Sequence, residues 1–150
     1  MLVVDTCVLI DIADDDPMFG ERSAECLATR AEEGFTLSPV SYVELAPVFD
    51  GSRRLLDEFL AGLGVDAAAV FDQADRHAAF SAWARHISER RAGRTGRRPA
   101  ADVLIGAFAM RHNGLITRNS SDFATLYPTL RIVDPTSPPG GRAQRAPGRG

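Results

Sequence analysis

The first eleven residues, Met1-Leu-Val-Val-Asp-Thr-Cys-Val-Leu-Ile-Asp11, decide the fold class. The three residues after Met1 form an unbroken apolar run, which is typical of a strand buried on both faces of a parallel sheet. The run ends at Asp5, and open α/β sheets place their ligand sites at the carboxyl ends of such strands. Thr6 offers a hydroxyl that can cap the helical segment that follows. This stretch therefore predicts an α/β domain with a carboxylate at its functional edge.

The length and composition indicate one globular domain. A chain of 150 residues can bury about two-thirds of its unfolded surface without disulfides or metals. No apolar stretch approaches the ~20 residues of a membrane span, and no signal peptide precedes the first strand. We therefore expect a cytoplasmic protein with no membrane contact. Cys7 and Cys26 are too few for a disulfide framework and show no metal-ligand spacing, so we expect two reduced thiols.

The charge is distributed unevenly along the chain. Residues 1–84 hold 16 acids and 5 arginines, whereas residues 85–150 hold 4 acids and 12 arginines. All 17 basic residues are arginine. The lack of lysine argues against a P-loop, a receiver domain and a haloacid-dehalogenase-type phosphatase, because each relies on a lysine at the phosphate. A phosphatase with Asp5 as nucleophile also needs a second aspartate two residues on, where this chain has Cys7.

Hydrophobic periodicity predicts alternating strands and helices after the first strand. The apolar stripe of the long predicted helix 75–91 (Ala79, Phe80, Trp83, Ala84, Ile87) is predicted to be core. After Asp134 the chain has no apolar residue larger than alanine, so we predict a domain over residues 1–134 and a disordered tail over 135–150. The further predicted strands are 35–37, 65–71, 115–117 and 130–133. The predicted helices after the one that follows Thr6 are 21–33, 41–49 (kinked by Pro47 or confined by it to the first turns), 53–63, 75–91 and 99–112.

Four acids lie near the ends of these strands. Asp5 ends the first strand and Glu44 lies just past the second. Asp102 starts the helix that leads to the fourth strand, and Asp122 follows that strand. Each has a local alternative. Ser41 and Glu44 have the spacing of a capping box, Asp102 suits the first turn of a predicted helix, and Asp122 could cap the turn that leads to Leu126. In a right-handed β-α-β arrangement, however, all four converge on one edge of the sheet. Carboxylates ~4 Å apart repel by about 4 kcal/mol, which a divalent cation relieves. All-oxygen ligands select Mg²⁺ or Mn²⁺ over zinc.

Four stretches of the chain resemble the motifs of PIN-domain nucleases, most closely the VapC toxins of bacterial toxin–antitoxin pairs. They are Asp5-Thr6, Ser41-x-x-Glu44, Arg98-Pro-Ala-Ala-Asp102 and Thr117-Arg-Asn-Ser-Ser-Asp-Phe123. The resemblance covers residues 1 to about 134 and implies a three-layer α/β/α fold around a parallel sheet of about five strands. It implies that the four acids form a catalytic metal site, with Thr6 and Asn119 as supporting polar groups. Cys7, at a position where a small polar residue is common, and Pro47 depart from the pattern.

The resulting hypothesis is an Mg²⁺-dependent endoribonuclease, with Mn²⁺ able to substitute. A metal-activated water would attack phosphorus in line and leave a 5′-phosphate and a 3′-hydroxyl. The resemblance further implies a VapB-like antitoxin partner and a homodimer. The alternative hypothesis is a non-catalytic PIN-like module that binds RNA or protein. Because the chain has no lysine, arginines would bind the RNA backbone beside the cleavage point. The candidates are Arg91, Arg94, Arg97, Arg98 and Arg118.

Overall fold

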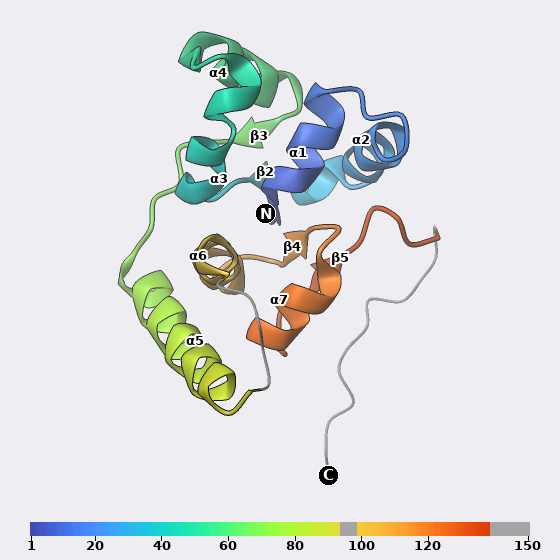
Figure 1. Cartoon of the computed structure of the whole chain (residues 1–150). Helices are drawn as coiled ribbons and strands as arrows, with labels where there is room; N and C mark the ends of the chain where they lie inside the picture. The colour runs from blue at the N-terminus through green and yellow to red at the C-terminus, as the bar shows by residue number, and fades with distance from the viewer. Residues whose placement is uncertain (94–98, 139–150) are drawn as a thin grey trace.

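Five short parallel strands form the centre of the molecule in the residues that the computed structural model describes, 1–93 and 99–138. Their order in the sheet is β3-β2-β1-β4-β5, and every neighbouring pair is parallel (Figure 1). This confirms the predicted parallel sheet. The third strand is shorter than its predicted range. The strands are β1 (Leu2–Val4), β2 (Phe35–Thr36), β3 (Val65–Asp66), β4 (Leu115–Ile116) and β5 (Ile132–Val133).

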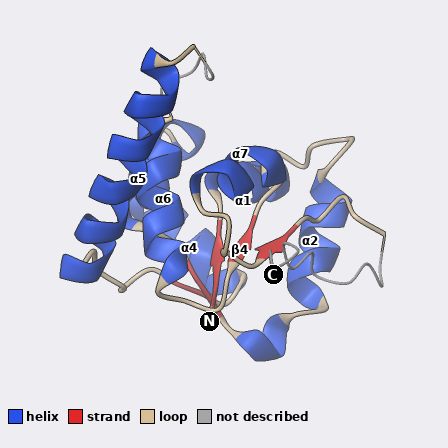
Figure 2. Ribbon diagram, turned by 90° about the horizontal axis from the view of Figure 1, so that it is seen from below, coloured by secondary structure: helices blue, strands red, loops and turns tan. Residues whose placement is uncertain are grey.

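Helices cover both faces of this sheet and complete the predicted α/β/α sandwich (Figure 2). One face packs against α1, α2 and α4, and the other against α5, α6 and α7. The α-helices are α1 (Thr6–Ala13), α2 (Gly20–Ala28), α3 (Pro39–Glu44), α4 (Arg53–Gly62), α5 (Gln73–Arg91), α6 (Ala100–Met110) and α7 (Ser120–Leu126), and two 3₁₀ turns lie at η1 (Ala31–Glu33) and η2 (Ala46–Phe49).

Burial on both faces explains the apolar first strand. Leu2 and Val4 pack into the core beneath α1, α2 and α4, while Val3 points into the opposite core. All three are fully shielded from solvent. Because successive side chains of a strand point to opposite faces, a strand between two helical layers has no solvent side and needs no polar residue.

The chain changes direction across the sheet at β1. It runs from β1 to β2 on one side and later returns to β4 on the other side of β1. Asp5 follows β1, and its backbone N–H donates to the carbonyl of Ile116 at 3.0 Å. Asp5 and Thr117 therefore stand beside each other at the switch point of the sheet, where α/β folds place ligands.

The starts of two helices differ from their predictions. Asp5, not Thr6, occupies the cap position of α1 and accepts a hydrogen bond from the Thr6 N–H. Helix α3 begins at Pro39 and is capped by Ser38, whose Oγ accepts from the Ser41 N–H at 3.1 Å. Proline favours the first position of a helix, which places the start three residues earlier than a capping box at Ser41 required. Glu44 therefore lies at the end of α3.

One predicted helix and one predicted core face were also partly wrong. The segment 21–33 divides into α2 and η1. On α5, Phe80 is 77% exposed, whereas Ala82 and His86 are buried. This helix packs mainly along α6. Small side chains at the contact let two helices approach closely, so the bulky Phe80 faces outward.

The described chain continues past the predicted domain boundary at Asp134. Pro135 is buried, and the Thr136 N–H donates to Asp134 Oδ1 at 2.8 Å. Most of the predicted tail, residues 139–150, lies outside the described residues, as do residues 94–98. In the part that the structure describes, no helix has the length and apolar character needed to cross a membrane.

Candidate active site

Asp5 is held at the switch point by three hydrogen bonds. Its Oδ1 accepts from the Thr6 N–H at 2.8 Å, and its Oδ2 accepts from Thr117 Oγ1 at 2.7 Å and from Cys7 Sγ at 3.3 Å. The residue is only 4% exposed. Burial raises the pKa of Asp5 above its ordinary value despite these hydrogen bonds, and the negative charge of Glu44 raises it further. A cation beside this carboxylate would offset the cost of its ionised form.

Glu44 joins this site through Thr6. Thr6 Oγ1 donates to Glu44 Oε2 at 2.5 Å, which ties the start of α1 to the end of α3. Thr6 is buried and Glu44 is exposed. The backbone N–H of Thr6 therefore donates to Asp5, and the hydroxyl of Thr6 donates to Glu44. Thr6 thus lies between the two acids, and its supporting role stays a prediction.

Asp102 and Asp122 lie in the first turns of α6 and α7. Both helices begin at the carboxyl edge of the sheet, because α6 runs back toward the start of β4 and α7 follows the end of β4. Helix α6 contacts both β1 and α3, and one carboxylate oxygen of Asp102 is buried. Asp122 is exposed, as is Asn119. The four predicted acids thus share one edge, with Asp5 and Glu44 linked through Thr6.

The donors suit a hard cation held partly by water. Among residues 1–93 and 99–138, no three side chains of His, Cys, Asp or Glu lie close enough together to enclose a metal ion. Mg²⁺ does not need such a cage, because it keeps several waters and binds through one or two carboxylates plus substrate phosphates. The linked pair of Asp5 and Glu44 fits this requirement.

Thr117 is the site residue that sequence reasoning missed. It is fully buried, donates to Asp5 and accepts the Asn119 N–H through the same Oγ1 at 3.0 Å. A hydroxyl residue ending a strand is a weak signal, and its partner lies 112 residues away in sequence. Cys7 completes the surroundings of Asp5. Burial and the Asp5 charge raise the pKa of its thiol to about 12.

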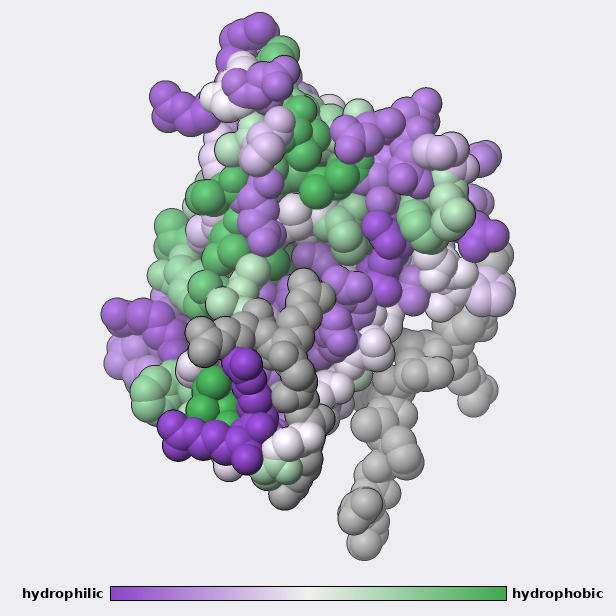
Figure 3. Space-filling view, in the orientation of Figure 1, coloured by the Kyte–Doolittle hydropathy of each residue, from purple (hydrophilic) through white to green (hydrophobic). Residues whose placement is uncertain are grey.

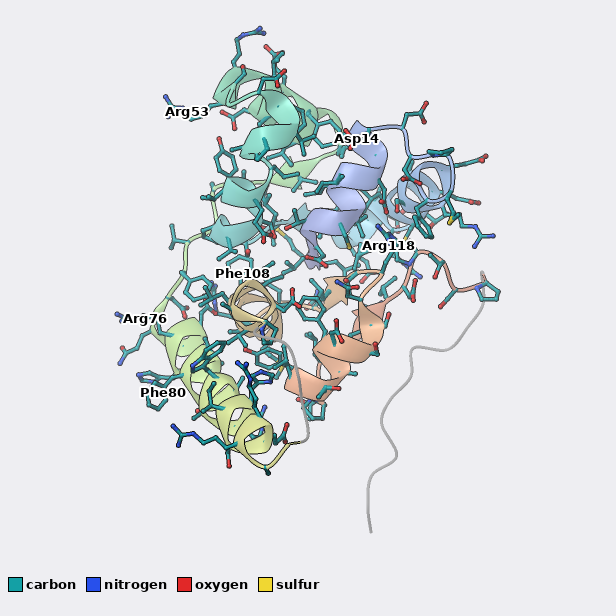
Figure 4. The ribbon with its side chains drawn as sticks, in the orientation of Figure 1. Asp14, Arg53, Arg76, Phe80, Phe108 and Arg118 are labelled. Atoms are coloured by element: carbon teal, nitrogen blue, oxygen red, sulfur yellow. The ribbon has the colours of Figure 1, made fainter. Side chains whose placement is uncertain are left out.

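The predicted RNA-binding arginines occupy different environments. Arg91 is exposed at the end of α5, and Arg94, Arg97 and Arg98 lie outside the described residues. Arg118 instead donates from Nε and Nη2 to the two carboxylate oxygens of Asp11, at 2.7 and 2.9 Å. Figure 4 shows Arg118 beside α1 and α2, directed into the protein.

An apolar pocket of about 360 Å³ adjoins Glu44. Its lining comes from α3, from α6 and from the segment before α5, and Val43 is 70% exposed on its rim. Hydrophobic surface lies near α3 and α4 on the face shown in Figure 3. The acidic edge therefore borders an apolar surface. The lining residues are Pro39, Val40, Val43, Glu44, Phe71 and Leu104.

The fold and the site define the class of the protein: a three-layer α/β/α domain with acidic residues at the switch point of a parallel sheet. The PIN domain family model matches residues 2–127, and the chain belongs to this family. No curated protein matches the chain.

Two solved structures share the fold. One, described as FitAB bound to an IR36 DNA fragment, has a TM-score of 0.64 at 19% identity and covers 90% of this chain and 95% of its own. The other is VapBC2 from Rickettsia felis bound to a promoter DNA fragment. Its TM-score is 0.65 at 16% identity, and it covers 89% of this chain and 97% of its own.

Proposed function

We propose that this protein is a metal-dependent endoribonuclease of the VapC toxin type. The observation that carries the proposal is the buried Asp5 carboxylate at the switch point, tied through Thr6 to Glu44. A buried carboxylate next to a second acid is unfavourable in an isolated fold, and a divalent cation resolves that conflict. Membership of the PIN domain family supports a nuclease over other metal-dependent activities.

The acids of the site would hold the metal, and two threonines would orient them. Asp5 and Glu44 would hold Mg²⁺, with Asp102 and Asp122 contributing directly or through water. Thr117 and Thr6 would keep the two carboxylates oriented, since each hydroxyl donates to one of them. Bound Mg²⁺ supplies charge neutralisation at the phosphate and a water of lowered pKa. The reaction is hydrolysis of an RNA phosphodiester to a 5′-phosphate and a 3′-hydroxyl.

The arginine-rich segment that precedes α6 would bind the RNA substrate. Arg91, Arg94, Arg97 and Arg98 lead directly into the helix that carries Asp102. Guanidinium groups bind phosphate oxygens in a sequence-independent way, which would hold the strand on either side of the cleavage point. The acidic edge itself repels RNA, so binding there would require the cation.

The proposed partners are a VapB-like antitoxin and a second copy of this chain. Both solved neighbours carry the names of two-component complexes, FitAB and VapBC2, which supports an antitoxin partner for this chain. The apolar pocket beside Glu44 offers surface that a protein partner could bury together with the acidic edge.

Metal-induced thermal stabilisation tests the metal site. Mg²⁺ or Mn²⁺ is expected to raise the Tm of the wild type, because ligands that bind only the folded state stabilise it. Asp5→Asn should abolish the shift and Asp102→Asn should reduce it. Glu25→Gln, at an exposed acid on α2, is the matched control and should keep it. An unchanged shift in Asp102→Asn would remove Asp102 from the metal site.

Mapping of RNA 5′-phosphate ends after brief induction in a bacterial host tests the activity. New ends at defined sites are expected for the wild type and not for Asp5→Asn. Identical maps for two folded proteins would favour the non-catalytic RNA- or protein-binding module instead.

A further inference from the structure

We infer that Arg118 is a positioning residue of the acidic site, acting through Thr117 on Asp5, and is not an RNA contact. The inference rests on the proposed metal site. Arg118 directly follows Thr117, the residue whose hydroxyl holds the buried carboxylate of Asp5. Its guanidinium binds Asp11, which lies on the helix that Asp5 caps. The ion pair therefore connects the same two segments that the Thr117–Asp5 hydrogen bond connects.

The geometry of this ion pair is that of a fixed structural link. Arg118 Nε and Nη2 form a two-pronged contact with Asp11, which is 3% exposed. Ser23 on α2 donates a third hydrogen bond to the same carboxylate at 3.1 Å. The guanidinium carbon lies 4.0 Å from the ring centre of Phe19, so the group is packed as well as paired. Planar forks of this kind restrict orientation more than a single charge contact does.

These contacts leave Arg118 poorly suited to bind phosphate. Two of its donor groups are directed at Asp11, and the arginine side chain is only 28% exposed. Moving it to a phosphate would remove the charged partner of the buried Asp11 carboxylate and leave it only the Ser23 hydrogen bond, which is strongly unfavourable. A small displacement of the end of β4 would move Thr117, whose hydroxyl donates to the Asp5 carboxylate. Removing Arg118 should therefore loosen Thr117 and, with it, the orientation of Asp5.

The chain contains a second two-pronged arginine–aspartate pair away from the site. Arg111 binds Asp75 through Nε and Nη2 at 3.0 and 2.9 Å, Asp75 is 1% exposed, and Asp72 Oδ2 lies 3.1 Å from the same Nε. Its guanidinium carbon also lies over a phenylalanine, 5.3 Å from the ring centre of Phe108. Arg111 follows the C-terminal end of α6, ~14 Å along the helix from Asp102. It is therefore a matched control that shares the stabilising role without contacting the segment of Thr117.

The test compares Arg118→Met with Arg111→Met in the full chain. Urea unfolding measures stability, and the electron paramagnetic resonance signal of free Mn²⁺ measures metal binding at a temperature where both variants are folded. Both variants should lose stability. Only Arg118→Met should weaken Mn²⁺ binding, by roughly tenfold, the lower end for residues that orient metal ligands. Arg111→Met should stay within about twofold of the wild type, because Arg111 pairs with Asp75 and does not orient a residue of the proposed metal site.

The outcomes separate this inference from the proposed function. Equal Mn²⁺ affinities in Arg118→Met and Arg111→Met would overturn the positioning role while leaving the metal site intact. A wild type that binds no Mn²⁺ would overturn both. If Arg118→Met does not fold, Arg118→Lys and Arg111→Lys are compared in the same way, because lysine keeps the charge and loses the fork. A selective loss of Mn²⁺ affinity in Arg118→Lys would support the inference.

Discussion

Gly106 allows α6 and α7 to pack closely, and replacing it with alanine should destabilise the protein. A Cβ atom at this position would lie 2.3 and 2.5 Å from two ring carbons of Tyr127 and 3.3 Å from Phe123. The Tyr127 ring is 6% exposed, and its hydroxyl donates to the carbonyl of Val103. The ring therefore cannot turn aside without losing that hydrogen bond.

The expected cost follows from these contacts. Overpacking a buried site costs about 1–3 kcal/mol, and a contact this short belongs at the upper end. Loss of the tyrosine hydrogen bond adds about 1 kcal/mol, and the better helix propensity of alanine returns a similar amount. We expect Gly106→Ala to lower the free energy of unfolding by roughly 2–3 kcal/mol, which corresponds to a decrease in Tm of about 10 °C.

Urea unfolding followed by circular dichroism is the assay, and Gly62→Ala is the control. Gly62 ends α4, and a Cβ there would have no atom within 4 Å. The same substitution should therefore be neutral or stabilise by about 0.5 kcal/mol through helix propensity. If Gly106→Ala proved as stable as Gly62→Ala, the close approach of α6 and α7 described here would be refuted.

Three further predictions concern the site and its surroundings. Asp5→Asn should stabilise the metal-free protein at pH 7, because the raised pKa of Asp5 means that its ionised carboxylate destabilises the fold. This gain in unfolding free energy should vanish as the pH falls toward 3.8, and unfolding curves from pH 4 to 7 would check it. Burial and the Asp5 charge raise the pKa of Cys7 to about 12, so only ~10⁻⁴ of the thiol is ionised at pH 8. Mass spectrometry after iodoacetamide treatment should show Cys7 unmodified in the folded protein and modified in urea. Ser38→Ala should cost about 1 kcal/mol of unfolding free energy through loss of the α3 cap, whereas a change near zero would contradict that role.

Local features of the sequence predicted the strand that carries the first acid. The apolar run ending at Asp5 predicted β1 and the position of its acid, and the structure confirms both. Helix starts were predicted less well. Ser41 and Glu44 matched a capping box, but Ser38-Pro39 three residues earlier is the stronger start because proline is favoured at the first helical position. Two local signals competed there, and spacing alone did not rank them.

The sequence by itself determined the α/β class, the parallel strands and the position of Asp5 at the end of β1, because these depend on periodicity and on residues adjacent in the chain. Only the tertiary structure decided that Thr117 holds Asp5 and that Arg118 pairs with Asp11, since these contacts depend on β4 lying beside β1. It also decided that His86 is buried and Phe80 exposed. A helix has several partly apolar faces, and the neighbour it packs against selects which one becomes core.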